Sequence, residues 1–185
     1  MGDRFQVIVD LDADQADAGR LARRVVERLM AGDVVLAERT TCVLGQPWGH
    51  PPGPHWERAV TDDRDGEPWD GLAVHTRCTG FISGADMPGA ALCPRCGAFA
   101  LLGDETWQRF GTAMRTWYDT GTATVDCPAC ATAVAVPDWA WDEAPLAFGC
   151  PGFEFWNRPD LTDAFRARPA ELLDGHRTAY VRGKL

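Results

Sequence analysis

The sequence is short of positive charge. It holds a single lysine, Lys184, and its 18 basic residues face 27 acidic ones, which gives a formal net charge of −9. Nonspecific affinity for nucleic acid comes from Lys and Arg that displace counterions from the phosphate backbone. Because the basic residues are few and scattered along the chain, the composition argues against a general binder of nucleic acid.

Long apolar runs are also missing. Nowhere do about eighteen apolar residues stand together, the length that a membrane-spanning helix needs. The opening MGDRFQVIVDLD has no basic leader followed by an apolar run. Gln6 stands where a myristoylation signal needs Ser or Thr. We therefore expect a cytoplasmic protein without a membrane anchor.

The motifs of nucleotide-binding enzymes are missing as well. The one Gly-Lys pair, Gly183 and Lys184, is followed by Leu185 and not by Ser or Thr, so the chain has no P-loop. No Gly-x-Gly-x-x-Gly follows the first predicted strand. Both absences disfavour ATP hydrolysis and dinucleotide chemistry, and we expect no bound nucleotide.

Cysteine is what the sequence does have. The count of seven is odd, and in a chain without a secretion signal it favours thiols and metal over a framework of disulfides. Four of the seven form two Cys-x-x-Cys pairs, CPRC and CPAC, about thirty residues apart. This spacing is typical of a structural zinc site, whose predicted ligands are Cys93, Cys96, Cys127 and Cys130.

The predicted zinc site is a closed one. Four thiolates fill the tetrahedral shell and leave no position for a water molecule, so the ion is expected to stabilise the fold and not to catalyse. Gly97 allows the left-handed residue that follows such a turn, whereas Ala131 stands in the equivalent place of the second pair. The alternative, a dithiol redox pair, leaves the second Cys-x-x-Cys unexplained.

Periodicity predicts strand, helix and strand in the first part of the chain. Residues 5–11 are apolar and β-branched, and a helix follows that Asp12 or Asp14 can cap. Gly32 stands where that helix needs a left-handed residue to end. The second strand is expected in residues 34–45, VVLAERTTCVLG, and residues 72–78 are predicted to form another strand.

Between the Cys pairs, Asp104 can cap a helix with one apolar face, which carries Trp107, Phe110, Met114 and Trp117. Near the end, LAFGCPGFEFW predicts a strand broken by Pro151 and Gly152. A helix from Asp160 and a last strand after Gly175 follow.

Together these elements predict an α+β fold. Their order matches the βαββαβ arrangement of a ferredoxin-like sheet with a zinc-ribbon-like module inserted between its halves. We expect a single domain over residues 1–185, with the zinc-binding insertion at 90–136.

A proline-rich loop at residues 45–71 offers a possible recognition surface. Rigid loops with aromatic and imidazole groups lose little conformational entropy on binding. The candidate partner-binding residues are Trp48, His50, His55 and Trp56, although both tryptophans can instead pack inward and anchor the loop.

The other cysteines and histidines support weaker hypotheses. Cys42, His50 and His55 could serve a metal- or thiol-dependent enzyme, but no local motif assembles them. His75 and Cys78 are three residues apart on a predicted strand, which points them to opposite faces. Cys42 and Cys150 are more simply read as small apolar fillers of the core.

Six segments taken together resemble a family of small zinc-ribbon-containing proteins from actinobacteria such as Streptomyces. They are ERTTCVLG, PPGP, CPRCG, CPAC, GFEFWNRPDL and VRGKL. Members of that family are often labelled sugar ABC transporter ATPase, a label that the missing phosphate motifs make implausible here. The resemblance carries over the four cysteine ligands and no catalytic residue.

The sequence favours a zinc-stabilised module that binds another protein, as an adaptor, a regulator or an immunity-type factor, without catalysis. The first alternative is the enzyme that uses Cys42, His50 and His55. The second is a nucleic-acid-binding zinc ribbon, which needs a local basic face built from Arg95, Arg109 and Arg115.

Overall fold

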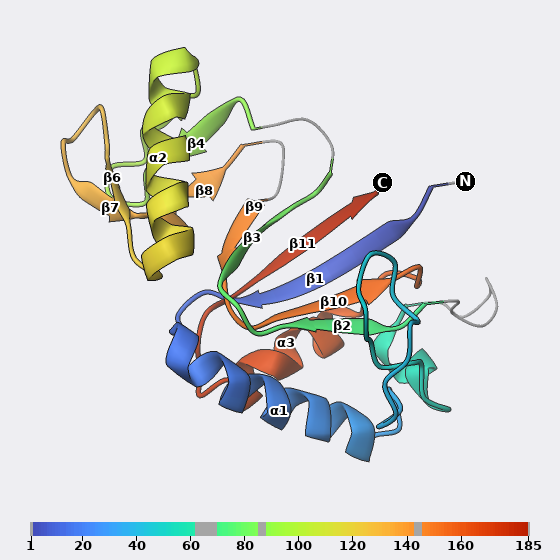
Figure 1. Ribbon diagram of the computed structural model, residues 1–185. Coiled ribbons are helices and arrows are strands. Elements are labelled where there is room, and N and C mark those ends of the chain that lie inside the picture. The colour runs from blue at the N-terminus through green and yellow to red at the C-terminus, as the bar shows by residue number, and fades with distance from the viewer. Residues whose placement is uncertain (1, 62–69, 85–87, 143–145, 185) are drawn as a thin grey trace.

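The structure, a computed structural model, describes residues 2–61, 70–84, 88–142 and 146–184. It has a mixed α+β fold with several antiparallel sheets (Figure 1), which confirms the predicted fold class. The helices are α1 (Gln15–Ala31), α2 (Asp104–Thr120) and α3 (Asp163–Leu172), with 3₁₀ turns η1 (Trp56–Ala59) and η2 (Val136–Asp138).

The strands fall into two groups. The lower body in Figure 1 contains β1 (Arg4–Asp10), β2 (Leu72–His75), β10 (Gly152–Trp156) and β11 (Thr178–Lys184). The remaining strands are β3 (Thr79–Ile82), β4 (Ala90–Leu92), β5 (Phe99–Leu101), β6 (Thr124–Asp126), β7 (Ala133–Ala135), β8 (Ala140–Trp141) and β9 (Leu146–Gly149). The prediction of a strand in residues 34–45 was wrong: this segment forms only isolated bridges, Val35 with Pro52 and Thr40 with Gly49.

The main sheet has the strand order β11-β1-β10-β2, and all neighbouring strands are antiparallel. The central strand β1 pairs Val7 with Glu154 of β10 on one side and with Val181 of β11 on the other. Helices α1 and α3 cover one face of this sheet (Figure 1). Between them and the sheet lies an apolar core that includes Ile8, Leu21 and Phe153.

Helix α1 forms where its sequence pattern predicts it. The side chain of Asp14 caps the helix by accepting a hydrogen bond from the backbone N–H of Asp17. Leu21, Val25 and Leu29 recur at four-residue spacing and are all buried against the sheet. The prediction of a left-handed residue at Gly32 was wrong, however: Gly32 has φ −93°, and the chain turns at Asp33, with φ 54°.

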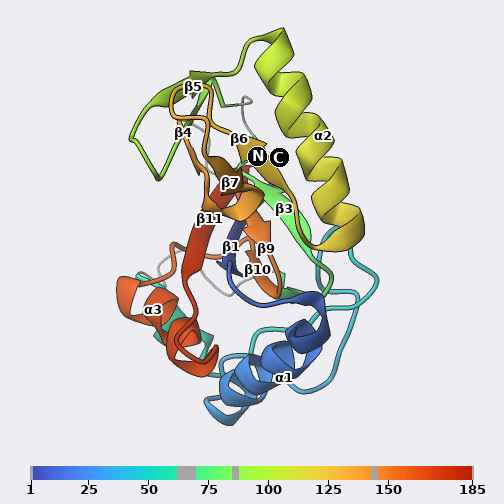
Figure 2. The ribbon, with the colours of Figure 1, turned by 90° about the vertical axis from the view of Figure 1, so that its left-hand side faces the viewer.

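The opposite face of the main sheet is covered by the antiparallel pair β3 and β9. Phe81 of β3 lies against Gly152 of β10, where a Cβ atom would stand 2.3 Å from the ring, so only glycine fits. The two strands then run from the main sheet to a second body (Figures 1 and 2). Through this pair the second body is joined to the sheet.

The second body, called here the cysteine module, consists of α2 and strands β4 to β8. It contains a three-stranded sheet of order β5-β4-β8 and the two-stranded pair β6-β7. Its core is aromatic: the ring of Phe110 makes edge contacts with Trp139 at 5.0 Å and with Trp141 at 5.2 Å between centroids. Phe110 and Trp117 are fully covered, as the predicted apolar face of this helix requires.

Two helix starts differ from the predictions. Gly103 is the N-cap of α2 and Asp104 its first residue. Helix α3 begins at Asp163 with Thr162 as its cap, and not at Asp160. The reason is that the backbone of Leu161, which precedes the cap, makes contacts with other parts of the chain. Leu161 donates its N–H to the side chain of Gln6 at 2.8 Å and forms an isolated bridge with Val60.

No helix within the described ranges is long and apolar enough to cross a membrane.

Candidate metal centre and neighbouring sites

Two similar turns bring the four cysteines together. Cys93 and Cys96 lie between β4 and β5, and Cys127 and Cys130 lie between β6 and β7. In the first turn the N–H of Gly97 donates to the carbonyl of Cys93 at 2.9 Å. In the second, the N–H of residue 131 donates to the carbonyl of Cys127 at 2.8 Å. The same local hydrogen bonding therefore shapes both turns.

The four sulfur atoms all lie within 4.8 Å of one another. Cys96 Sγ and Cys127 Sγ are 3.8 Å apart. Two thiolates that each stand about 2.3 Å from an ion at a tetrahedral angle are separated by about 3.8 Å, so this pair has the spacing of a shared ion. Within the described residues, the four predicted ligands are also the one group of side chains close enough to hold a metal.

The thiols influence one another strongly. The side chain and the backbone N–H of Thr132 lower the pKa of Cys130 to about 6. The pKa of Cys96 moves the other way: although the N–H of Ala98 lowers it, burial and the neighbouring thiols raise it to about 12. Four negative charges in so small a volume repel each other, and a divalent cation removes that repulsion. The cluster is therefore suited to a metal ion.

The second turn carries a strained residue. Gly97 has φ 71° and Ala131 has φ 55°, so both turns use a left-handed residue at the same place, and the alanine does not change the turn. A residue with a Cβ pays roughly 1–2 kcal/mol for this conformation. We expect Ala131→Gly to raise the free energy of unfolding of the metal-loaded protein by about 1 kcal/mol.

The matched control is Ala129, an exposed residue of the same turn outside the left-handed region. Ala129→Gly should lower the free energy of unfolding by about 0.5 kcal/mol. At this position glycine relieves no strain in the folded state and only raises the conformational entropy of the unfolded chain. Urea unfolding of both variants measures the two changes. Equal changes in the two variants would contradict a strained Ala131.

Cys78 and Cys150 are joined by a disulfide across 72 residues of sequence, with their Cα atoms 4.6 Å apart. The prediction that the cysteines outside the two pairs remain free thiols was therefore wrong for these two, and Cys150 is more than an apolar filler. The bond connects the segment after β2 to the segment between β9 and β10. The bond lies at the end of the main sheet that is next to the start of α1.

The predicted partner-binding residues lie in different surroundings. Trp48 is 56% exposed, whereas Trp56 is partly buried against the core beneath the main sheet. His50 is buried, and its Nδ1 donates a hydrogen bond to the carbonyl of Leu36 at 2.9 Å. His55 is half exposed and lies 3.4 Å from Glu57. Only Trp48 and His55 thus offer substantial surface to a partner.

Cys42, His50 and His55 form no common metal site in the described part of the chain. The sulfur of Cys42 packs against Gly49 and Gly71: a Cβ atom added at Gly71 would lie 2.5 Å from it. Of the three residues of the enzyme hypothesis, His50 is buried and Cys42 is partly buried, whereas His55 stays half exposed beside Glu57.

An acid–histidine cluster at the end of β1 was missed by the sequence reasoning. The carboxylate of Asp10 is fully buried and accepts hydrogen bonds from the N–H groups of Asp12 and Ala13 at 2.9 and 3.0 Å. His176 Nδ1 also donates to Asp10 at 2.9 Å. Beside it, Arg177 bridges Asp12 and Asp138. His176 is 166 residues from Asp10, and Arg177 is 165 residues from Asp12 and 39 from Asp138, so no local sequence motif indicates this cluster.

This cluster predicts a pH dependence of stability. The hydrogen bond to Asp10 raises the pKa of His176, and the charges of Asp12 and Asp174 act in the same direction against partial burial. A pKa that is higher in the folded state than in the unfolded state stabilises the fold at low pH, and this contribution is lost as the pH rises through the folded value.

We therefore expect wild type to exceed His176→Gln in stability by more at pH 5.5 than at pH 8.5, about one unit below and two above the ordinary histidine pKa. Denaturant unfolding of both proteins at the two pH values measures the difference. If the difference in free energy of unfolding between wild type and His176→Gln is the same at both pH values, or is larger at pH 8.5, the imidazolium does not stabilise the fold.

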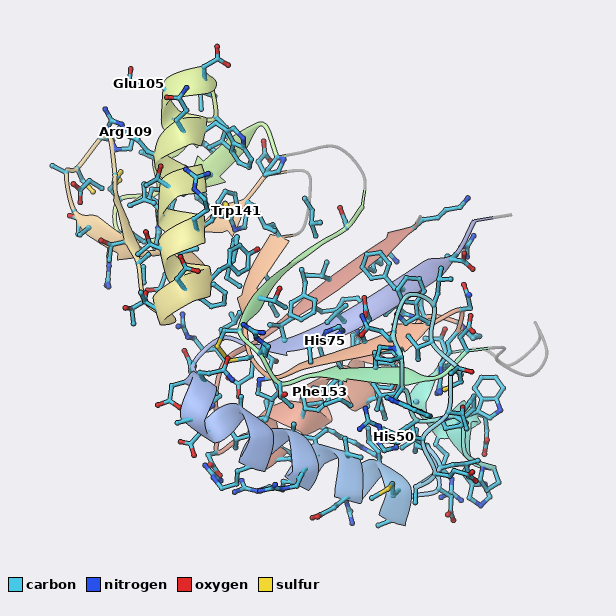
Figure 3. The ribbon with its side chains drawn as sticks, in the orientation of Figure 1. His50, His75, Glu105, Arg109, Trp141 and Phe153 are labelled. Atoms are coloured by element: carbon cyan, nitrogen blue, oxygen red, sulfur yellow. A yellow bond between two sulfur atoms is a disulfide. The ribbon has the colours of Figure 1, made fainter. Side chains whose placement is uncertain are left out.

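The arginines proposed as a basic face are all exposed, but one of them is neutralised. Arg109 forms an ion pair with Glu105 at 2.7 Å near the start of α2 (Figure 3). Arg115 donates to the hydroxyl of Thr112 at 3.2 Å, and the backbone N–H of Arg95 points at Cys93 Sγ at 3.4 Å. Of the three charges, only that of Arg109 has an acidic partner within the described residues.

The most exposed apolar side chains lie on the edge strand of that module. In β5, Phe99 is 61% and Leu101 75% exposed, while Ala100 between them is buried. Within the described residues β5 pairs only with β4, so its outer side is an unpaired edge. Sequence reasoning missed this surface, because three residues next to a Cys pair show no clear strand pattern.

Comparisons with protein-family models, with curated proteins and with solved structures gave no match to this chain.

Proposed function

We propose that the protein is a zinc-stabilised module that binds another protein through the edge of the cysteine module. The observation that carries this proposal is strand β5, an open sheet edge with two exposed apolar side chains beside a closed four-cysteine cluster. A closed cluster leaves no catalytic position, and the edge offers a surface for recognition.

Zinc is the proposed ion because of the ligand set. Thiolates are soft ligands, and four of them at tetrahedral spacing are typical of structural zinc sites. Each of the two turns supplies one pair of ligands, and in each pair the first cysteine, Cys93 or Cys127, is buried inside the module. Zinc bound there would hold β4, β5, β6 and β7 in place and so fix the position of the edge strand.

The main sheet is proposed to be ferredoxin-like. The chain order β1, α1, β2, β10, α3, β11 and the sheet order β11-β1-β10-β2 support this topology. In that arrangement the cysteine module is an insertion between the second and third strands. The sheet then acts as a base from which the β3 and β9 pair presents the module.

An exposed edge of this kind suits strand addition. An extended partner segment can pair with the free N–H and C=O groups of β5, while its alternate side chains contact Phe99 and Leu101. Phe99 and Leu101 stand two residues apart on the same strand and so form one exposed apolar surface, the kind of feature that protein interaction sites use. We therefore propose that the partner protein binds through an extended segment with apolar side chains, which pairs with β5.

The test places a photo-reactive phenylalanine analogue at position 99 and, in a separate protein, at Tyr118. Both residues are exposed aromatics of the cysteine module, but Tyr118 lies on α2. Irradiation in the native host should yield a cross-linked protein from position 99 and not from position 118. The partner is then purified, and its affinity for wild type and for Phe99→Glu with Leu101→Glu is measured.

The double variant should weaken binding by at least about a hundredfold, since charges would face the partner's apolar side chains. Trp48→Ala tests the proline-rich loop and should leave the affinity unchanged. Equal affinity of the double variant and wild type would overturn the proposal, and a loss in Trp48→Ala alone would move the interface to the loop.

A further inference from the structure

The chain passes between the main sheet and the cysteine module at two neighbouring places. On the way out it leaves β2 and enters β3, and on the way back it leaves β9 and enters β10. Figure 1 shows β3 and β9 side by side between the two bodies. Cys78 lies on the first passage and Cys150 on the second, so the disulfide joins the two passages to each other.

The bond fills a gap between two hydrogen-bonded ladders. The ladder of β2 and β10 ends at the pair His75 and Gly152. The ladder of β3 and β9 begins at the pair Thr79 and Gly149. The residues between these two pairs lie outside the strands. The disulfide is therefore a cross-link at the point where one ladder stops and the next one starts.

The direct contact between the two bodies is short. Strands β3 and β9 are four residues long each. Their side chains Phe81 and Ala147 pack into the core on the main sheet, whereas Phe148 packs into the core of the cysteine module. Cys78 lies against the module's core as well, and the sulfur of Cys150 lies near the start of α1. The disulfide thus fastens the module's side of this contact to the main sheet's side.

The contacts that remain without the bond are weaker. The exposed side chain of Gln15 accepts a hydrogen bond from the N–H of Cys78 at 3.0 Å and donates one to the carbonyl of Thr76 at 2.8 Å. Hydrogen bonds of an exposed side chain compete with water and stabilise little. The disulfide restricts the two passages far more, because it removes chain entropy over the 72 residues that it spans.

The two sulfur atoms differ in exposure. Cys78 is partly exposed, whereas Cys150 is 0% exposed. A thiolate from solution therefore reaches the sulfur of Cys78 and expels Cys150. The sulfur of Cys150 lies 3.9 Å from the carbonyl oxygen of Ala13, which can accept its S–H in the reduced protein. The bond is open to attack from one side, and its buried partner has an acceptor for the proton that it gains.

We propose that this disulfide is a redox-sensitive lock between the cysteine module and the main sheet, opened by a dithiol. One thiolate of the dithiol attacks the sulfur of Cys78 and forms a mixed disulfide, while Cys150 leaves as a thiolate and takes up a proton. The second thiol of the dithiol then attacks the mixed disulfide and releases Cys78. Two electrons pass from the dithiol, which becomes a disulfide, to the protein, which gains two thiols. The lock does not depend on the proposed function.

The first experiment treats the folded full chain, as purified, with dithiothreitol and then with iodoacetamide, and maps the labelled cysteines by mass spectrometry. Without dithiothreitol, Cys78 and Cys150 should carry no label. After reduction both should be labelled, Cys78 before Cys150 because it is the more exposed thiol. Label on Cys78 without dithiothreitol, or a bond that is reduced only after denaturant is added, overturns the proposal.

The second experiment measures the opening by limited trypsin digestion. Arg77 is exposed and directly precedes Cys78, so it reports on the passage, whereas Arg109 reports on α2 and Arg23 on α1. Reduction should speed cleavage after Arg77 at least about tenfold and leave the other two sites unchanged, because cleavage follows the population of locally open chain. Unchanged cleavage after Arg77 overturns the lock, and so does an equal acceleration after Arg109, which would mean that the module unfolds.

Two variants separate the lock from other effects of the reductant. Cys78→Ser reproduces the opened state without dithiothreitol and should be cleaved after Arg77 as fast as reduced wild type. Adding dithiothreitol to this variant should change nothing further, and an acceleration as large as that of wild type would overturn the proposal. Cys42→Ser is the matched control: it removes the cysteine outside both the bond and the cluster and should respond to dithiothreitol as wild type does.

Discussion

Cys127→Ser is expected to release the metal and to unfold the cysteine module. Cys127 is a buried member of the four-sulfur cluster and follows β6 directly. A structural zinc ion contributes on the order of 10 kcal/mol to a small module, and three remaining thiolates do not hold it with the same geometry. The cores that pack the two faces of the main sheet contain none of the four cluster cysteines, so the main sheet should persist.

Hydrogen exchange followed by mass spectrometry resolves these two bodies in one experiment. Amides of α2, β6 and β7 should lose protection in Cys127→Ser, and those of α1 and β1 should keep it. Cys42→Ser is the control, because Cys42 lies outside the cluster and should leave both metal content and protection in α2 unchanged. Wild-type metal content and melting temperature in Cys127→Ser would refute the assigned role of the cluster.

The second large effect is expected at Phe110, the most enclosed ring of the cysteine module. Its side chain is 0% exposed and lies between Trp139 and Trp141. Removing such a ring leaves a cavity that the neighbouring rings fill only in part, so Phe110→Ala should cost about 3 to 5 kcal/mol in the unfolding of the module. Guanidinium unfolding followed by tryptophan fluorescence measures this loss.

Phe99→Ala is the matched control, since it removes the same side chain from the exposed edge of the same module. It should change stability by less than about 0.5 kcal/mol, because the ring is already in contact with water. The same variant should weaken partner binding, which Phe110→Ala affects only through unfolding. If Phe99→Ala destabilised the module as much as Phe110→Ala, the edge strand would be a packing surface and not a free one.

The sequence was sufficient wherever the determining interactions are local. Three features depend on residues within a few positions of one another: the start of α1, where Asp14 was one of two expected caps, the apolar face of α2, and the two Cys-x-x-Cys turns. The same holds for the break at Pro151, where β9 ends and β10 begins. Periodicity and spacing report such features directly.

The features that were missed depend on distant partners. Cys78 meets Cys150 only because β2 and β10 are neighbours in the sheet, and Asp10 meets His176 because β1 and β11 are. The start of α3 shifted for the same reason: Gln6 of β1 holds the backbone of Leu161. A tertiary contact here overrides a local capping signal.

Surface sites were the hardest to predict. The edge strand β5 is only three residues long, and its exposure follows from the strand order of the module. This surface depends on how the strands are arranged in space, which the sequence pattern alone does not show.

The most direct test of the central claim is a native mass spectrum of the protein purified from its own host, with Phe99→Glu and Leu101→Glu run beside wild type. The account predicts a single zinc ion per chain in both proteins and a second polypeptide retained by wild type alone. A chain without metal or with two metal ions, or a polypeptide retained equally by both proteins, would contradict it.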